Sequence, residues 1–200
     1  MSISGNQAKY MTNNPLKRYL INRFMRVTMN LLEMSAARTV LDAGCGEGYT
    51  IELISRAFDY DITGVDINLE ALEYAESMFR NNDSIKLTAS NIYEMPFNDN
   101  SFDIVICNEV LEHLEEPTCA LDEIQRVSKG KAIISVPHEP YFTLSNFLAL
   151  NHLKSFGNAP GHINHFNIKR IKKLIDTYMK DYKLYFSFPW IVVYGSFRGK

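Results

Sequence analysis

Residues 39–48, with the sequence TVLDAGCGEG, decide the fold of this 200-residue chain. The short apolar run from Thr39 to Leu41 is typical of a buried β-strand, and it ends at the acidic Asp42. Three glycines at alternate positions come next, followed by a segment with a helical apolar period: Gly44, Gly46 and Gly48, then 49–57. This order predicts a strand, a tight glycine turn and a helix. In an open α/β sheet such a turn lies at the carboxyl end of a strand, where ligands bind, and glycine leaves the backbone open to close approach.

The spacing of these glycines indicates a ligand with a positive charge. A dinucleotide-binding turn has the pattern G-x-G-x-x-G, whereas this chain has G-x-G-x-G with Asp42 before it. A carboxylate at that place repels a phosphate and favours a cation. A second predicted strand over 61–66 ends at Asp66, and an acidic residue about 20 positions after the turn usually holds ribose hydroxyls. A nucleoside that carries an amino acid and a positive sulfur fits both features, and S-adenosylmethionine is such a molecule.

Three segments resemble the class I S-adenosylmethionine-dependent methyltransferases, in the small stand-alone branch called type 11. They read VLDAGCGEG, GVDIN and FDIVICNEVLEHLEEP, and the resemblance covers about residues 35–200. It implies a doubly wound, mostly parallel, seven-stranded Rossmann-like α/β sheet with an antiparallel C-terminal hairpin and an N-terminal helix. It also implies S-adenosylmethionine as the methyl donor and S-adenosylhomocysteine as the product.

The pattern along the chain agrees with this fold class. Strands are predicted near 39–42, 61–66, 85–89, 102–107 and 131–136, alternating with helices near 48–58, 69–80 and 109–128. Such alternation favours a parallel sheet with helices on both faces. Later elements are a helix over 140–153, a helix capped by Asn167, and strands near 181–188 and 190–197. We therefore expect residues 1–37 to form a tail and a lid or packing helix, and residues 38–200 to form the methyltransferase domain, with a substrate-side insertion at 137–166.

Composition indicates one globular domain, with 46% hydrophobic and 22% charged residues. The three cysteines lack C-x-x-C spacing, which excludes a disulfide framework or a zinc site built on them. No apolar run has membrane-spanning length and no signal peptide is recognisable, so we expect a cytoplasmic protein, as a monomer or homodimer. Residues 39–130 hold 19 acidic and five basic residues, whereas both ends of the chain are basic. Basic ends can attract an anionic substrate, a nucleic acid or a membrane surface, although solvated helix faces explain them as well.

The resemblance assigns roles around the cofactor. Asp42 would hold the methionine ammonium, and the amides of the glycine turn would line the methionyl part. Asp66 would accept the ribose hydroxyls, Ile67 would lie against adenine, and Asn108 would lie beneath the sulfonium. Asn91 stands where the family usually has an acid, and its side-chain oxygen could still receive the adenine amino group. The predicted cofactor-binding residues are Asp42, Gly44, Cys45, Gly46, Gly48, Asp66, Ile67, Asn91, Ile92 and Asn108.

The acceptor side offers carboxylates and histidines. If a helix begins at Asn108 or Glu109, the side chains of Glu109, Glu112 and His113 share one face. His113 or His165 is predicted to act as a base or positioning group, with Glu109 as a further catalytic candidate. Aromatic residues of the insertion could wall an acceptor or pack in the core: Tyr141, Phe142, Phe147, Phe156 and Phe166.

The same residues also permit a divalent metal, in the set Glu109, Glu112, His113 and His165, with His162 as another loop histidine. Ubiquinone-pathway O-methyltransferases have a similar E-x-x-E-H run. Enzymes that methylate the 3′-terminal ribose of small RNAs add a later H-x-x-H. Because E-x-L-E-H-L also occurs in type-11 members not known to need metal, a metal-free site is the preferred interpretation.

Three functions remain open from the sequence. The first is O-methylation of a small molecule, and the second is methylation of RNA or another polyanion, for example at a terminal ribose with a divalent metal. The third is a non-catalytic module that keeps the cofactor as a structural ligand.

Overall fold

A seven-stranded sheet forms the centre of the computed structural model, which describes residues 10, 12–148 and 161–200. The strands are β1 (Thr39–Ala43), β2 (Asp61–Asp66), β3 (Ile85–Ala89), β4 (Phe102–Asn108), β5 (Ser128–Pro137), β6 (Met179–Ser187) and β7 (Trp190–Phe197). Their order is β3-β2-β1-β4-β5-β7-β6, with β1 to β5 parallel and β7 antiparallel to both β5 and β6. The predicted doubly wound sheet with an antiparallel C-terminal hairpin is confirmed.

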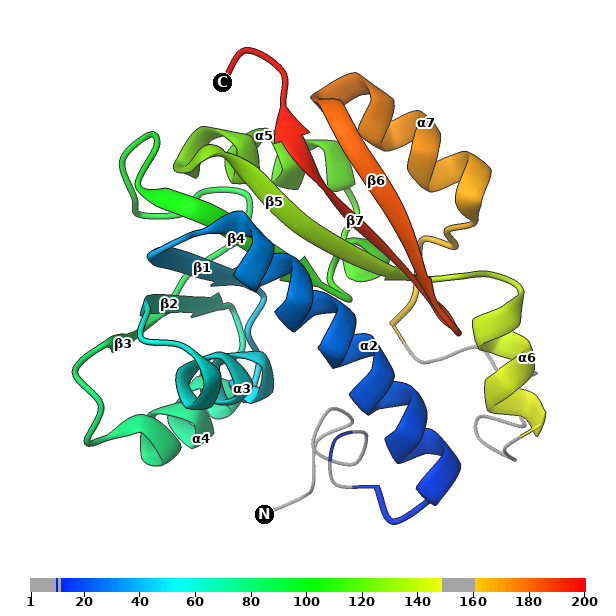
Figure 1. Cartoon of the computed structure of the whole chain (residues 1–200), viewed down its shortest axis with the longest axis horizontal. Coiled ribbons are helices and arrows are strands. Elements are labelled where there is room, and N and C mark those ends of the chain that lie inside the picture. Colours follow the sequence, from blue (N-terminus) through cyan, green and yellow to red (C-terminus); the bar gives the residue numbers. More distant parts are fainter. Residues whose placement is uncertain (1–9, 11, 149–160) are drawn as a thin grey trace.

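Helices cover both faces of the sheet (Figure 1). One face packs against α2 (Pro15–Ser35), α3 (Tyr49–Ala57) and α4 (Leu69–Phe79). The other face packs against α5 (Pro117–Val127) and α7 (Ile168–Tyr178). Alternate residues of the central strands enter the two cores, so that Val40 faces the α2 side and Leu41 faces the α5 side.

The N-terminal helix α2 packs across the C-terminal half of the sheet. Asn14 caps it by accepting hydrogen bonds from two backbone amides, and Pro15 occupies its first turn. Phe24 is fully buried and stacks on Trp190 of β7, with 4.9 Å between the ring centroids. The helix ends where Ala36 adopts a left-handed conformation. No helix among the described residues combines the length and apolarity that a bilayer crossing requires.

The prediction of one helix over 109–128 is wrong. β4 ends at Asn108, Glu109 has a φ of 57°, and a short 3₁₀ turn η1 (Leu111–His113) precedes α5. Pro117 begins α5, and a proline disfavours helical conformation in the residue before it. Glu109, Glu112 and His113 therefore do not lie on one helical face.

The insertion is described only in part. α6 (Tyr141–Leu148) follows β5, and Asn167 caps α7 through the amide of Arg170, as predicted. The side chain of Phe147, the whole of Phe156 and the end of the predicted 140–153 helix lie outside the described residues. Phe166 is buried in the core beneath α7, so it cannot wall an acceptor.

Candidate active site

The glycine turn after β1 brings the backbone next to two acidic strand ends. Gly44, Gly46 and Gly48 all have positive φ, at 85°, 51° and 80°. A side chain at Gly44 would place its Cβ 2.4 Å from a methyl carbon of Val110, so space as well as φ requires glycine there. The amide of Gly46 donates to a carboxylate oxygen of Asp66 at 2.7 Å. The turn therefore joins the end of β1 to the end of β2.

Asp42 at the end of β1 is a buried carboxylate. It is 2% exposed, and its Oδ2 has no hydrogen-bond partner among the described residues. Burial, and secondarily the negative charge of Asp66, raise the pKa of Asp42 to about 7. A cation that binds beside this carboxylate would stabilise its ionised form strongly, because little else among the nearby described residues offsets the negative charge.

Asp66 at the end of β2 is held in a fixed orientation. One carboxylate oxygen accepts from the amide of Gly46, and the other accepts from the amide of Asn68 at 2.8 Å. Each carboxylate oxygen has a further lone pair, so Asp66 can still accept two hydroxyl groups. Asp42 is the last residue but one of β1 and pairs with Gly64, and Asp66 ends the adjacent parallel strand β2.

A cavity of about 50 Å³ opens beside Asp42. It is lined by residues of the glycine turn, the start of α3, the end of β4 and an N-terminal tyrosine: Tyr10, Asp42, Gly44, Cys45, Glu47, Tyr49, Thr50, Asn108 and Glu109. The side-chain amide of Asn108 is buried, and neither its nitrogen nor its oxygen has a hydrogen-bond partner among the described residues. Tyr10 stacks on Tyr49, with ring centroids 4.6 Å apart. The cavity thus holds unsatisfied acceptors of both kinds, carboxylate and amide.

The predicted adenine contacts lie outside this cavity. Ile67 is 72% exposed directly after Asp66, whereas Ile92 is buried. The side-chain oxygen of Asn91 accepts a hydrogen bond from the amide of Tyr93 at 3.0 Å. One lone pair of that oxygen is therefore engaged, and only the second could receive an amino group.

On the acceptor side, His113 is held by a loop from far along the chain. Its Nδ1 lies 2.9 Å from the carbonyl oxygen of Gly161. Because a carbonyl oxygen only accepts, Nδ1 is the donor of this hydrogen bond, and the neutral tautomer that matches it has its lone pair on Nε2. The His162 ring meets the His113 ring edge-on, with centroids 4.8 Å apart.

Three side chains that the sequence offered as metal ligands lie close together beside η1. Ligand atoms of Glu112, His113 and His162 all lie within 4.8 Å of one another. Among the described residues, neither Glu109 nor His165 joins that group. Glu109 instead lines the cofactor-side cavity, and the Nδ1 of His165 lies 3.8 Å from a carboxylate oxygen of Glu139. The proposed set with Glu109 and His165 therefore needs correction, because the chain turns at Glu109 and the loop presents His162.

The loop carrying His162 is fixed to η1 by its backbone and by one asparagine. The amides of Ile163 and Asn164 both donate to the carbonyl oxygen of Glu112 at 2.9 Å. The side-chain nitrogen of Asn164 donates to Leu114 at 2.6 Å and to Leu111 at 3.3 Å. Asn164 could not be singled out from the sequence, because an asparagine between two histidines has no distinctive spacing.

Comparison with known proteins identifies the domain. Residues 41–136 match the family model described as a methyltransferase domain. Residues 41–136 therefore carry a methyltransferase domain, in agreement with the resemblance to the class I S-adenosylmethionine-dependent methyltransferases. Residues 41–136 contain the glycine turn, Asp66, Asn91, Asn108 and His113, so the matched segment includes most of the predicted site.

Relatives of this methyltransferase domain occur in longer proteins. A probable S-adenosylmethionine-dependent methyltransferase of Mycobacterium tuberculosis is 30% identical over 130 residues, which are 65% of this chain and 46% of that protein. An O-methyltransferase of Aspergillus nomiae is 32% identical over 117 residues, 57% of this chain and 52% of that protein. The chain thus spans about half the length of the curated relatives it matches. A methyltransferase of Aquifex aeolicus has a similar fold, with a TM-score of 0.65 at 16% identity, covering 84% and 88% of the two chains.

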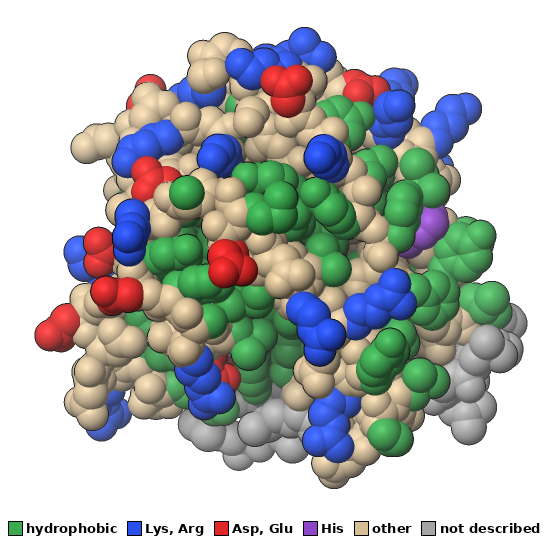
Figure 2. Space-filling model, viewed as in Figure 1, with side chains coloured by type: hydrophobic (Ala, Val, Ile, Leu, Met, Phe, Trp, Pro, Cys, Tyr) green, Lys and Arg blue, Asp and Glu red, His purple; other side chains and the backbone are tan. Residues whose placement is uncertain are grey.

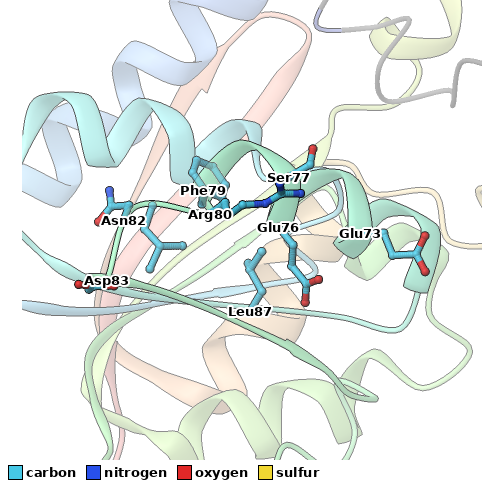
Figure 3. Close-up of a pocket in the computed structure, with 9 residues that line it drawn as sticks. Glu73, Glu76, Ser77, Phe79, Arg80, Asn82, Asp83 and Leu87 are labelled. Atoms are coloured by element: carbon cyan, nitrogen blue, oxygen red, sulfur yellow. The ribbon is translucent and has the colours of Figure 1, made fainter.

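A second, wider groove among the described residues lies away from the predicted site. Its volume is about 560 Å³, and side chains of α4 and the edge strand β3 line it (Figure 3). Glu73, Glu76, Asp83 and Arg80 form part of its wall over an apolar base that includes Leu87. None of the predicted cofactor or catalytic residues lines this groove.

Proposed function

We propose that the chain transfers a methyl group from S-adenosylmethionine to an oxygen atom of a small-molecule acceptor. The observation that carries the proposal is the pair Asp42 and Asp66, which end adjacent strands on either side of a glycine turn. The Asp42 carboxylate is buried, and its Oδ2 has no hydrogen-bond partner within the described part of the chain, whereas two amides orient the Asp66 carboxylate. A cationic amino-acid end and a ribose end match these two environments.

The cofactor would span the cavity and the open surface beside it. The methionine ammonium would pair with Asp42. The side-chain amide of Asn108 would form hydrogen bonds with the methionyl part of the cofactor. A cavity of about 50 Å³ has room for this end only. The adenosyl end would extend past Asp66 and over the exposed Ile67, which the adenine ring would cover. When bound, the cofactor supplies an activated methyl group on a positive sulfur.

Methyl transfer then requires alignment and, for a hydroxyl acceptor, a base. His113 suits this role because the Gly161 carbonyl selects the tautomer that leaves Nε2 able to take a proton. His165 is the second candidate, since its Nδ1 faces Glu139. Transfer to oxygen is also supported by the Aspergillus nomiae relative, which is named as an O-methyltransferase.

The test is formation of S-adenosylhomocysteine with a panel of phenols, catechols and hydroxy acids. We expect turnover with some of them, and His113→Gln should lower kcat about 100-fold or more without changing cofactor affinity. His165→Gln is the matched comparison for the second histidine. If the protein binds the cofactor but no acceptor gives product above the background of Asp66→Ala, the non-catalytic binding module replaces this proposal.

A second candidate function is metal-assisted methylation of a terminal ribose, as in RNA. It is favoured by the convergence of Glu112, His113 and His162, a carboxylate and two imidazoles that suit a divalent ion. Such an ion would engage the two hydroxyls of the acceptor. A chelator should then abolish turnover, Mn²⁺ should restore it, and His162→Ala should weaken the Mn²⁺ dependence. Turnover that persists in the presence of chelator would contradict this candidate.

A further inference from the structure

A continuous patch of exposed apolar side chains lies where α6 meets the tip of the β6–β7 hairpin. We call it the aromatic patch, and its members are Tyr141 (48% exposed), Leu144 (51%), Phe186 (51%) and Phe188 (47%). The Tyr141 and Phe188 rings lie 6.4 Å apart. His138 connects the two elements, with its ring 4.9 Å from that of Tyr141 and 6.1 Å from that of Phe186. Contiguous exposed apolar surface of this kind marks an interaction site more often than single exposed residues do.

The aromatic patch shares one edge of the sheet with the cofactor turn. The register pairs Pro137 of β5 with Trp190, and Trp190 with Ser187 of β6. The same strand β5 pairs Ser135 with Asn108 at the end of β4. The carboxyl ends of β1, β4, β5 and β6 therefore lie along one edge. A binding partner that docked on the aromatic patch would therefore lie next to the carboxyl ends of these strands, where we expect the acceptor to enter.

The amino-terminal half of α2 adds positive charge beside the patch. Phe24 of α2 stacks on Trp190, and Phe142 of α6 contacts the same indole edge-on, so α2 and α6 both pack against one ring. This half of α2 has exposed arginines and two exposed apolar side chains: Arg18, Arg23, Arg26, Leu16 and Tyr19. The only acidic residue of α2 is Glu33, which is near the opposite end of the helix.

The space-filling view shows this combination on one side of the molecule. Figure 2 has hydrophobic side chains gathered over α6 and the hairpin tip, with Lys and Arg side chains between them and α2. In this view Asp and Glu side chains lie elsewhere on the face. Among the described residues seen on this face, the surface over α2, α6 and the hairpin tip thus combines apolar and cationic side chains.

We propose that the aromatic patch and the amino-terminal half of α2 dock on an anionic lipid bilayer. Tyr and Phe side chains beside Arg are the composition that inserts at the boundary between headgroups and acyl chains, while the arginines meet lipid phosphates. The aliphatic side chains of Leu16 and Leu144 favour lipid over single-stranded nucleic acid, because bases stack on aromatic rings and phosphates need only cations. As a consequence that rests on the proposed function, the acceptor would be an amphipathic molecule taken from the bilayer surface.

The experiment is co-sedimentation of the full chain with vesicles of phosphatidylcholine alone or with 30% phosphatidylglycerol. We expect the bound fraction to be about fivefold higher on the anionic vesicles and to fall as salt screens the arginines. The double variant Phe186→Ser/Phe188→Ser and the double variant Arg23→Gln/Arg26→Gln should each lower anionic-vesicle binding about fivefold. Met34→Ser is the matched control, because Met34 is 67% exposed on α2 but lies near its other end.

Several results would overturn the docking proposal. They are equal binding of wild type to both vesicle types, retention of binding in both double variants, and an equal loss in Met34→Ser. Binding of a poly-uridine oligonucleotide that the same variants abolish, with no vesicle binding, would assign the surface to nucleic acid instead. Thermal melts and cofactor calorimetry on each variant separate this surface from the cofactor site, since both should stay as in wild type.

Discussion

The role proposed for Asp42, binding of a cationic ligand, is accompanied by a cost to the stability of the folded state. The Asp42 carboxylate is buried near the end of β1, and one oxygen lacks a hydrogen bond to any residue that the structure describes, so burial destabilises the ionised form in the absence of a cation. The pKa of this carboxyl, about 7 in the folded chain against an ordinary 3.8, expresses that cost. Binding energy from a cationic ligand would offset it.

The first prediction is that Asp42→Asn stabilises the protein without ligand while weakening S-adenosylmethionine binding. Because the folded pKa lies above the unfolded one, the contribution of Asp42 to stability falls as pH rises from 3.8 through 7, by at most about 4 kcal/mol. Thermal melts should therefore show a gain of the variant over wild type that grows between pH 5 and pH 8. Calorimetry at pH 7 should show cofactor affinity at least about tenfold weaker. Identical melting differences at the two pH values would contradict this account of Asp42.

Sequence alone predicted the residues whose role depends on local spacing. The glycines of the turn, Asp42 and Asp66 follow from strand ends and a short motif, and the structure places them together. Asn91 was harder to interpret, since the hydrogen bond from the Tyr93 amide that engages its oxygen belongs to a turn with no clear sequence signal.

At the scale of elements, the segment after β4 differs most from the sequence-based prediction. The helical period over 109–128 predicted one helix, whereas the structure has the turn η1 and the helix α5. The two are separate because Glu109 takes a left-handed conformation and Pro117 starts a new helix. The choice of His162 rather than His165 beside His113 depends on a contact across about 50 residues of chain, from Asn164 to Leu114. Periodicity within one segment carries no information about such a contact.

The second prediction concerns the loop that presents His162. Asn164→Ala removes two side-chain hydrogen bonds to the carbonyls of Leu111 and Leu114, and each is worth about 1 kcal/mol. Hydrogen exchange at the Ile163 amide, which donates to Glu112, should accelerate about tenfold or more, and turnover should fall while cofactor affinity is unchanged. Asn167→Ala, which removes only the cap of α7, is the matched control and should leave exchange at Ile163 as in wild type. Equal protection of that amide in Asn164→Ala and wild type would show that the loop does not depend on Asn164.

For the whole molecule, the order of strands places the proposed cofactor site and the aromatic patch along the edge of the sheet that the carboxyl ends of the parallel strands form. The order in which strands are added to the sheet reverses between the parallel neighbours β1 and β4, and this puts the glycine turn near the middle of this edge. The antiparallel β6–β7 hairpin extends the same edge as far as the aromatic patch, and α2 packs over that extension. The groove of Figure 3 lies at the outermost strand β3, and none of the residues predicted for cofactor binding or catalysis lines it.

The most direct measurement of the central claim is calorimetric titration of the full chain with S-adenosylmethionine, alongside Asp66→Ala and Glu76→Ala. Glu76 is an acidic residue of the β3 groove and serves as the matched control. We predict one-to-one binding to wild type and Glu76→Ala, and no detectable binding to Asp66→Ala although its melting temperature is retained. Absence of binding to folded wild type, or unchanged affinity in Asp66→Ala, would contradict the assignment of this site.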